Sequence, residues 1–250
     1  MSTDPFAPNS PYTERTDLLL GPEVSASLRR RHVFIAGLGG VGSFAAEAVA
    51  RAGIGRLTLL DHDVVGASNL NRQLVALRST VDQPKTDVMA ARIRDIDPEI
   101  EVTVVREFLR PDSIAELVPA DADFVLDAID SIACKAALVA AVRARGQAVI
   151  SSMGAGGRLD PTAVRVGLLE QTRCCPLARQ MRKRLRRLET GLDYPVVFSV
   201  EQPRKGTEHR PVGGPVGGRP RSVNGTISYL PAIFGLTAAG HVIRDLVARG

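Results

Sequence analysis

The chain alternates between short apolar runs and longer segments whose apolar residues recur every three or four positions. The first pattern is typical of buried strands, and the second is typical of helices that cover a sheet. Strands are predicted at 31–36, 56–60, 101–106, 122–127 and 148–151, and helices at 41–51, 85–95 and 132–145. Because strands and helices alternate, right-handed crossovers predict an α/β, Rossmann-like fold with a doubly wound, mostly parallel sheet.

The pattern changes after the fifth predicted strand. Residues 153–157 are rich in glycine and predict a flexible loop, and residues 176–189 predict a helix. The apolar stripe of that helix consists of Leu177, Met181, Leu185 and Leu188. Residues 202–222 are rich in proline, glycine and basic side chains, which predicts a mobile loop. Residues 228–248 regain an apolar helical pattern that can close the fold against the sheet.

The length and composition fit a single globular domain. A chain of 250 residues with 44% hydrophobic residues is ordinary for a soluble protein. We expect one domain over 1–250, in which 12–151 form the nucleotide-binding core and 152–250 form a substrate-facing C-terminal extension. No apolar run approaches the roughly 20 residues of a membrane span, and residues 1–11 lack the order of a signal peptide. A cytoplasmic protein without stable membrane insertion is therefore expected.

The three cysteines do not indicate a disulfide framework or a zinc site. Cys174 and Cys175 are adjacent, so a bond between them would be strained, and Cys134 lies within a predicted core helix. Structural zinc sites usually contain Cys-x-x-Cys pairs, and the sequence has none.

A glycine-rich turn follows the first predicted strand. Gly37, Gly39 and Gly42 satisfy the Gly-x-Gly-x-x-Gly pattern, with Gly40 inside the same turn. Such a turn lets the backbone approach phosphate, and the following helix presents free N–H groups to an anion. Asp61 ends the next strand and is placed to bind ribose hydroxyls. A glycine turn without a ligand is the alternative, and on these residues alone a dehydrogenase would be the leading interpretation.

The polar residues further along favour a triphosphate over a dinucleotide. Asn69, Asn71, Arg72 and Gln73 form one polar cluster, with Lys85 at a predicted helix start and Asp130 beyond the fourth strand. Arginine and lysine bind phosphate oxygens, and a carboxylate suits Mg²⁺ bound to ATP. Singly, each residue has a structural alternative: an Asx turn for the asparagines, a surface ion pair for Arg72, a solvated helix start for Lys85 and an N-cap for Asp130.

These motifs resemble the adenylation core shared by ubiquitin-activating enzymes and bacterial sulfur-carrier adenylyltransferases. The matching segments are 37–43, 61–63, 69–73, 83–85 and 127–130. Within that superfamily the chain is most similar to the tRNA threonylcarbamoyladenosine dehydratase group, and the likeness runs from about residue 12 to the end. The subgroup resemblance depends on segments 15–21, 71–73, 151–156, 175–179, 198–203 and 225–231.

The resemblance implies activation of a carboxylate by attack on the α-phosphate of ATP. In the dehydratases this carboxylate is the threonyl carboxylate of threonylcarbamoyladenosine at position 37 of tRNA, and a neighbouring group then displaces AMP and closes a ring. By motif position, Asp61 holds the ribose, Asp63 belongs to the same nucleotide-binding motif, and Asn69, Arg72 and Lys85 hold phosphates. Arg72, Lys85, Asp130 and Arg15 are the implied catalytic residues, and Asp130 is the implied Mg²⁺ ligand.

The resemblance also implies partners. An N-terminal arginine of the superfamily reaches the ATP of the partner subunit, and Arg15 is the matching residue, which implies a homodimer. A mobile tail residue is the alternative for Arg15. A cysteine desulfurase or sulfur-acceptor system is a candidate further partner. Two other functions stay open: an adenylyltransferase for a Gly-Gly-tailed sulfur carrier, which the missing Cys-x-x-Cys pairs disfavour, and a nucleotide-binding protein without catalysis.

The predicted helix at 176–189 contains the strongest nucleic-acid signal. Its basic residues can neutralise phosphates and release counterions. The residues expected to contact tRNA are Arg179, Arg182, Lys183, Arg186 and Arg187. A solvated helix face is the alternative.

Overall fold

A single seven-stranded sheet organises the protein. The computed structural model describes residues 13–204, 211–212, 221–222 and 225–249. The strands of this sheet are β1 (His32–Ala36), β2 (Arg56–Leu60), β3 (Glu101–Val105), β4 (Phe124–Asp127), β5 (Ala148–Ser152), β6 (Val164–Leu168) and β7 (Pro195–Ser199). Their order is β3-β2-β1-β4-β5-β7-β6, and all neighbours are parallel except the antiparallel pair β6 and β7. The predicted α/β, doubly wound, mostly parallel sheet is confirmed.

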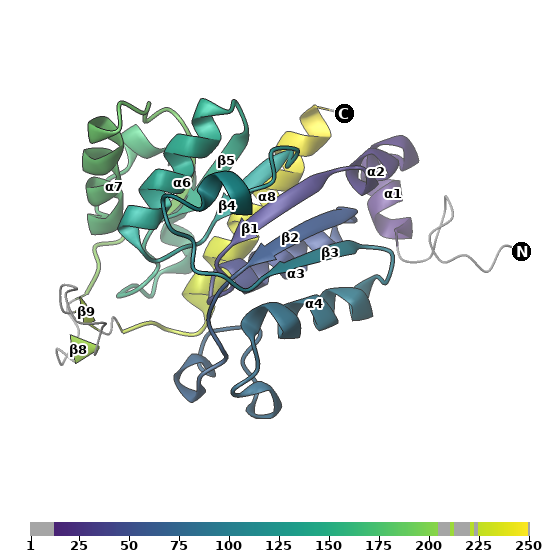
Figure 1. The fold of residues 1–250 in the computed structure, drawn as a ribbon, viewed down its shortest axis with the longest axis horizontal. Helices are drawn as coiled ribbons and strands as arrows, with labels where there is room; N and C mark the ends of the chain where they lie inside the picture. Colours follow the sequence, from purple (N-terminus) through teal and green to yellow (C-terminus); the bar gives the residue numbers. More distant parts are fainter. Residues whose placement is uncertain (1–12, 205–210, 213–220, 223–224, 250) are drawn as a thin grey trace, which may run out of the picture.

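Helices cover both faces of the sheet (Figure 1). On one face pack α3 (Gly42–Arg51), α4 (Lys85–Ile96) and α8 (Tyr229–Ala248). On the other face pack α5 (Ile114–Leu117), α6 (Ile132–Ala144) and α7 (Pro176–Arg187). Two helices, α1 (Glu14–Leu20) and α2 (Pro22–Arg29), precede β1. Short 3-10 helices lie at η1 (Ala67–Asn69), η2 (Arg78–Thr80), η3 (Pro161–Ala163) and η4 (Leu169–Gln171).

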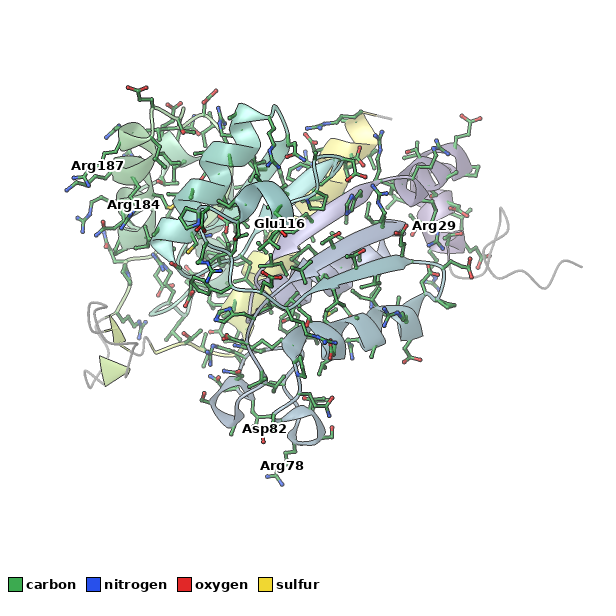
Figure 2. The ribbon with its side chains drawn as sticks, viewed as in Figure 1. Arg29, Arg78, Asp82, Glu116, Arg184 and Arg187 are labelled. Atoms are coloured by element: carbon green, nitrogen blue, oxygen red, sulfur yellow. The ribbon has the colours of Figure 1, made fainter. Side chains whose placement is uncertain are left out.

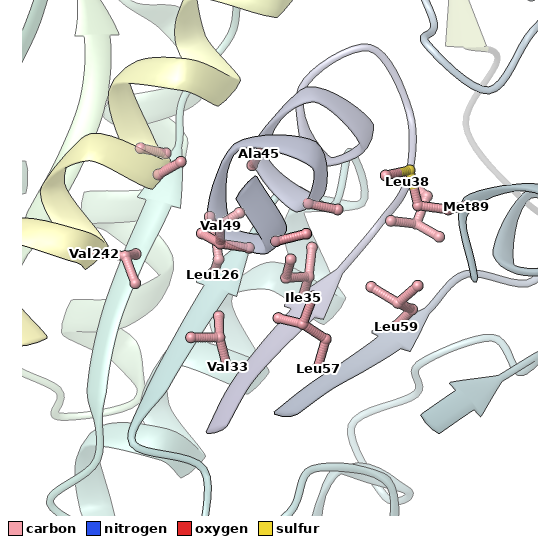
Figure 3. Close-up of a cluster of buried hydrophobic side chains, with 14 of the residues drawn as sticks. Val33, Ile35, Leu38, Ala45, Val49, Leu57, Leu59, Met89, Leu126 and Val242 are labelled. Carbon is pink, nitrogen blue, oxygen red and sulfur yellow. The ribbon is translucent and has the colours of Figure 1, made fainter. Parts of the chain in front are cut away.

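The central strand β1 is buried on both sides, as expected for a parallel sheet between two helical layers. Val33 and Ile35 point into the cluster beneath α3 and α8, which Figure 3 shows together with Val49 and Val242. Phe34, between them in sequence, points to the opposite face and packs with the residues of α6. This two-sided burial explains why the strand is a continuous apolar run without polar alternation.

Two strands of the C-terminal extension, β6 and β7, depart from the sequence-based expectation of a loop followed by a helix. β6 lies at the edge of the sheet, so Arg165 and Val166 face solvent and the strand lacks an apolar run. The expected stripe of α7 also needs one correction. The helix ends at Arg187, Leu188 is 50% exposed, and Ala178 is buried in its place.

Most of the predicted mobile loop at 202–222 lies outside the described residues. Within it the structure describes 202–204 and two short strands, β8 (Pro211–Val212) and β9 (Arg221–Ser222), which pair antiparallel. The N–H of Arg204 donates to the Gly157 carbonyl (2.7 Å), and the N–H of Gly157 donates to the Gly225 carbonyl (2.8 Å). The described residues on the two sides of 205–224 are therefore bonded to the same glycine.

The C-terminal helix α8 corrects the expectation that no apolar run approaches a membrane span. Among the described helices, it is the one long and apolar enough to cross a membrane, with 20 residues. In the structure it packs along the sheet beside α3, and Leu230, Phe234, Val242 and Leu246 are fully buried. Its apolar character is therefore explained by its place in the core.

Candidate nucleotide-binding site

A cavity of about 490 Å³ lies where β1, β2, β3 and β4 end. After β1 the chain continues outward to β2 and β3 and then returns to β4, so the connections that leave β1 and β4 diverge. Open α/β sheets bind their ligands at such a switch point, outside the carboxyl ends of the strands. The topology therefore places the cavity where a nucleotide is expected.

The cavity brings together most of the predicted site residues. Its wall contains Gly37, Gly39, Gly40, Asp61, Asp63, Asn69, Arg72, Lys85 and Asp130. Gly42 and Arg15 are not part of this wall. Residues that are distant in sequence therefore line one cavity. Residues with unrelated structural roles in turns and on the surface are not expected to gather in this way.

The glycine turn is shaped by close backbone contacts. Gly37 has a φ of +90°, and a Cβ placed there would lie 2.9 Å from the Ala128 carbonyl oxygen. A Cβ at Gly42 would lie 1.7 Å from the Gly37 carbonyl oxygen. Gly42 therefore acts through packing, because it lets the start of α3 approach the turn, while Gly37 lets the chain bend beside β4.

Asp61 connects the glycine turn to the end of β2. Its Oδ2 accepts the N–H of Leu38 at 2.6 Å, and its Oδ1 accepts the N–H of Asp63 at 2.8 Å. The carboxylate is thus held at the cavity wall, and each oxygen retains lone-pair capacity for a hydroxyl group of a ligand.

Two cationic side chains, Lys85 and Arg72, belong to the cavity wall. Lys85 is buried, and its Nζ lies 2.8 Å from Oδ2 of Asp63. The Nη1 group of Arg72 donates to the Ser68 carbonyl and to Oδ1 of Asn71, each at 2.9 Å. Oδ1 of Asn69 accepts the N–H of Gly66 at 3.0 Å, so this side chain also shapes the turn. An arginine and a lysine beside a glycine turn suit a ligand with several phosphates.

The carboxylates of the cavity differ in their fit to a metal ion. Ligand atoms of Asp61, His62 and Asp63 lie within 4.8 Å of one another. Both oxygens of Asp61 already accept backbone N–H groups, and Asp63 is paired with Lys85. Asp130 presents an exposed carboxylate to the same cavity. Carboxylate and phosphate oxygens are the donors that Mg²⁺ prefers, so the residues present fit a nucleotide-bound Mg²⁺.

The sequence interpretation missed an apolar wall. Phe108 and Leu109, from the loop after β3, line the cavity with Leu60 and Ile129. The Phe108 ring stands edge-on to His62, with 4.8 Å between ring centroids. The signal that could have located Phe108 is its position just after a strand, because neighbouring parallel strands end at the same edge.

Arg15 is not brought to the cavity of its own chain. It is exposed on α1, and α1 leads into α2, which ends just before β1 begins. Figure 1 shows both helices beside the start of β1, whereas the residues that line the cavity follow the ends of the strands. A role for Arg15 in nucleotide binding therefore requires a second copy of the chain.

The basic face of α7 forms a second hollow. A groove of about 610 Å³ is lined by Arg179, Gln180, Arg182, Lys183, Arg186 and Arg187. On the opposite side of the helix, Ala178, Met181 and Leu185 are buried against the sheet layer. Figure 2 shows Arg187 and Arg184 pointing away from the body of the protein. The helix thus has one apolar and one strongly cationic side.

Arg182 differs from its neighbours on α7. Its Nη1 donates to the carbonyls of Leu169 (3.3 Å) and Thr172 (3.1 Å) and to the Thr172 hydroxyl. The side chain therefore fastens α7 to the segment before it, and we assign Arg182 a structural part in addition to its positive charge.

A doubly wound sheet with a glycine turn, two cations and a carboxylate at its switch point defines a nucleotide-binding protein of the Rossmann-like class. A sequence profile of the ThiF family matches residues 14–250, and the chain belongs to this family.

Three relatives sharpen this assignment. The tRNA threonylcarbamoyladenosine dehydratase of Bacillus subtilis is 39% identical over 93% of each chain. The structures of the tRNA N6-threonylcarbamoyladenosine dehydratase of Escherichia coli in complex with AMP and with ATP have TM-scores of 0.85 and 0.84. Both are 37% identical to this chain; they cover 94% and 95% of it and 94% of the E. coli chain. The molybdopterin-synthase adenylyltransferase of Escherichia coli is 39% identical but matches 50% of this chain and 55% of its own length. The resemblance to the dehydratase group is thereby confirmed.

Proposed function

We propose that this protein is an ATP-dependent dehydratase that cyclises threonylcarbamoyladenosine at position 37 of tRNA. The observation that carries the proposal is the meeting of Gly37, Arg72, Lys85 and Asp130 in one cavity at the sheet's switch point. The likeness to the dehydratases over nearly the whole chain supports tRNA as the substrate, because it includes the residues after 151.

The first proposed step is adenylation. An oxygen of the threonyl carboxylate attacks the α-phosphorus of ATP, the bond to the β-phosphate breaks, and pyrophosphate leaves. Arg72 and Lys85 stabilise the charge that develops on the phosphoryl oxygens, since fixed cations in a partly closed cavity act more strongly than in water. Lys85 is held by Asp63, so its amine has a defined position before ATP binds.

The second proposed step closes the ring. A neighbouring group of the same modification attacks the acyl carbon, and AMP leaves with the former carboxylate oxygen. The attacking group loses its proton, so the net change in the nucleoside is the loss of one water. Neither step transfers sulfur, and a cysteine desulfurase has no part in this scheme.

Asp130 would hold the Mg²⁺ ion that accompanies ATP. The ion would supply neutralisation of phosphate charge in the adenylation step. The apolar wall of Leu60, Phe108 and Leu109 suits the adenine base, because an aromatic ring and aliphatic side chains bury a planar base.

The basic side of α7 is the proposed tRNA-binding surface. Arg179, Lys183, Arg186 and Arg187 line one groove. Clustered lysine and arginine residues bind the phosphate backbone by releasing counterions. A cytoplasmic location is part of this proposal.

We further propose that the active form is a homodimer in which α1 packs on a second copy. No residue of α1 is buried in the single chain, and Leu18 and Leu19 are 82% and 81% exposed. Arg15 lies on the same helix. A partner that covers these leucines would bring Arg15 toward the second nucleotide site.

Mass measurement of the modified nucleoside tests the proposed function. Purified protein is incubated with ATP, Mg²⁺ and tRNA that carries threonylcarbamoyladenosine, and the tRNA is then digested to nucleosides. The expected result is loss of the mass of one water from that nucleoside, with AMP and pyrophosphate as co-products. An unchanged nucleoside, with pyrophosphate exchange only after a Gly-Gly-tailed carrier protein is added, would establish the adenylyltransferase function instead.

A further inference from the structure

Asn71 links the nucleotide-binding site to the C-terminal extension. Its Oδ1 accepts a hydrogen bond from Nη1 of Arg72 at 2.9 Å, and its Nδ2 donates to the Thr226 carbonyl at 3.0 Å. The two partners determine the orientation of the amide, because a flipped amide would point its NH₂ group at the guanidinium and its oxygen at a carbonyl. Asn71 is therefore oriented from both sides.

The contact also orients Arg72. Both hydrogens of Nη1 are engaged, one by Oδ1 of Asn71 and the other by the Ser68 carbonyl. A guanidinium is planar, so fixing Nη1 fixes the direction of the three remaining donors on Nε and Nη2. Since Arg72 lines the cavity, these donors are available for two phosphate oxygens at once.

On its other side, Asn71 contacts the described segment that precedes α8. Thr226 follows Gly225, whose carbonyl accepts the N–H of Gly157 at 2.8 Å. Arg158, which follows Gly157 in sequence, is 3% exposed and donates to the Gly154, Gly156 and Glu201 carbonyls.

The same guanidinium reaches the basic helix. Nη2 of Arg158 donates to the Cys174 carbonyl at 3.3 Å. Cys175 follows directly and caps α7, since its Sγ accepts the N–H of Ala178 at 3.5 Å. A continuous series of contacts thus leads from Arg72, through Asn71 and Arg158, to the start of α7.

We propose that Asn71 is a positioning residue for adenylation. It holds the Arg72 guanidinium toward the triphosphate, and it takes its own orientation from Thr226, so the C-terminal extension sets the geometry of the phosphate site. The inference rests on the proposed function and deepens it, because it joins the tRNA-facing part of the chain to the group that binds phosphate. Asn71 is exposed, so its hydrogen bonds contribute little to folding and its substitution tests orientation.

Two substitutions separate the contacts of Asn71. Asn71→Ala removes both hydrogen bonds. Asn71→Asp keeps an acceptor for Arg72 but turns a carboxylate oxygen toward the Thr226 carbonyl, which repels it. Ser79→Ala is the control, because it changes an exposed polar side chain on η2 that is not part of the cavity wall.

The measurements are the dissociation constant of ATP with Mg²⁺ and no tRNA, and kcat for AMP formation with modified tRNA. We expect Asn71→Ala to weaken ATP binding and to lower kcat, each by about tenfold, the effect of losing a hydrogen bond to a charged group. Asn71→Asp should bind ATP no more tightly than Asn71→Ala, because it loses the contact with Thr226 and places a negative charge beside the phosphate site. Ser79→Ala should match the unaltered protein in both.

The outcome that overturns the inference is equal ATP affinity in the unaltered protein and Asn71→Ala, or an ATP affinity of Asn71→Asp that equals that of the unaltered protein. A drop of the melting temperature that matches the losses would assign Asn71 a structural role and overturn it as well. Failure of the proposed function is distinguishable, because the unaltered protein would then form no AMP with modified tRNA, while the ATP affinities would still decide whether Asn71 positions Arg72.

Discussion

Lys135 and Asp127 form an ion pair that is closed off from solvent at the base of the nucleotide-binding site. Lys135 Nζ lies 2.8 Å from Asp127 Oδ2, and both side chains are 0% exposed. The carboxylate also accepts the Ser151 hydroxyl at 2.6 Å and the N–H of Ile129 at 3.1 Å. Ile129 immediately precedes Asp130, so this buried pair supports the loop that presents Asp130 to the cavity.

Removing the cation of this pair should strongly destabilise the fold. Lys135→Met leaves the Asp127 carboxylate buried without its partner, which costs about 3–5 kcal/mol of unfolding free energy. Urea denaturation measures the loss. Arg106→Met is the matched control, because Arg106 and Asp87 form an exposed pair at 2.7 Å whose loss should cost less than about 1 kcal/mol. Equal losses in the two variants would contradict the assigned role.

Substitution of the phosphate-site residues should stop adenylation and leave the fold intact. Arg72→Ala and Asp130→Ala each remove a charge that acts on the reacting phosphates, so kcat for AMP formation should fall by at least about 10²-fold. The assay measures radiolabelled AMP, and circular dichroism checks the fold. Arg78→Ala is the control, since Figure 2 shows this arginine, in η2, pointing away from the rest of the protein. Near-normal activity in either site variant would refute the assigned roles.

Neutralising the basic side of α7 should weaken tRNA binding and its salt dependence. Replacement of Arg179, Lys183 and Arg186 by glutamine removes three charges from the groove, and the slope of log K against log salt should fall by about two to three units. Filter binding at several salt concentrations measures this slope. Glutamine at Arg78, Arg94 and Arg110, exposed arginines outside the groove, removes the same charge as a control. An unchanged slope in the α7 variant would mean that this side of the helix is a solvated surface that does not bind tRNA.

Arg182 should remain unaltered in that experiment. Its guanidinium is bonded to carbonyls before α7, so its removal would lower stability and confuse the two effects.

Acid should destabilise the protein through a buried histidine. Burial lowers the pKa of His32, and the Arg56 guanidinium adds to this effect, whereas Asp121 and Asp123 oppose it. His32 is bonded to Arg56 at 2.9 Å and to the Thr58 hydroxyl at 2.9 Å, which suits a neutral ring. As the pH falls, His32 therefore takes up a proton in the unfolded chain before it does so in the folded protein. This histidine should leave the free energy of unfolding unchanged above about pH 6.5 and should lower it as the pH drops toward the pKa of His32 in the folded protein.

Urea denaturation at a series of pH values checks this dependence. His32→Gln should flatten the slope below about pH 6.5, because the side chain no longer titrates. Burial also lowers the pKa of His241, so the double variant His32→Gln/His241→Gln should be flatter still. A slope that stays the same after both substitutions would exclude these histidines as its cause.

The proposed dimer predicts the behaviour of α1. Leu18→Ser with Leu19→Ser should shift the protein from dimer to monomer in sedimentation velocity, because these leucines would form the apolar centre of the interface. Leu77→Ser, which changes a leucine that is 56% exposed elsewhere, should leave the dimer intact. A monomeric unaltered protein, or a dimer that survives the α1 substitutions, would contradict the proposal.

The sequence predicted the parts of the fold whose burial is visible in local composition. β1 and β4 are buried on both faces and appear as continuous apolar runs, and α8 keeps an apolar helical pattern. β6 was missed although the other edge strand, β3, was predicted, because β6 contains Gly167 and its partner β7 lies more than 25 residues away in sequence.

The site shows the same division. The glycines are recognisable because their spacing along the chain reflects one local turn, and Asp61 is recognisable because it directly follows the next predicted strand. Phe108 carries no motif, and only the pairing of β2 with β3 brings it beside the cavity. The structural role of Arg182 could not be predicted either, because a sequence gives the charge of this residue but not the carbonyl groups that it contacts.

The closure of residues 205–224 at Gly157 has a consequence for changes in the length of that segment. Because the neighbours on either side, Arg204 and Gly225, bond the same glycine, the distance between the ends of this segment does not depend on what lies between them. Doubling such an excursion costs only about 0.6 kcal/mol of closure entropy. Changes in the length of this segment should therefore leave Arg204 and Gly225 in place and cost the fold little.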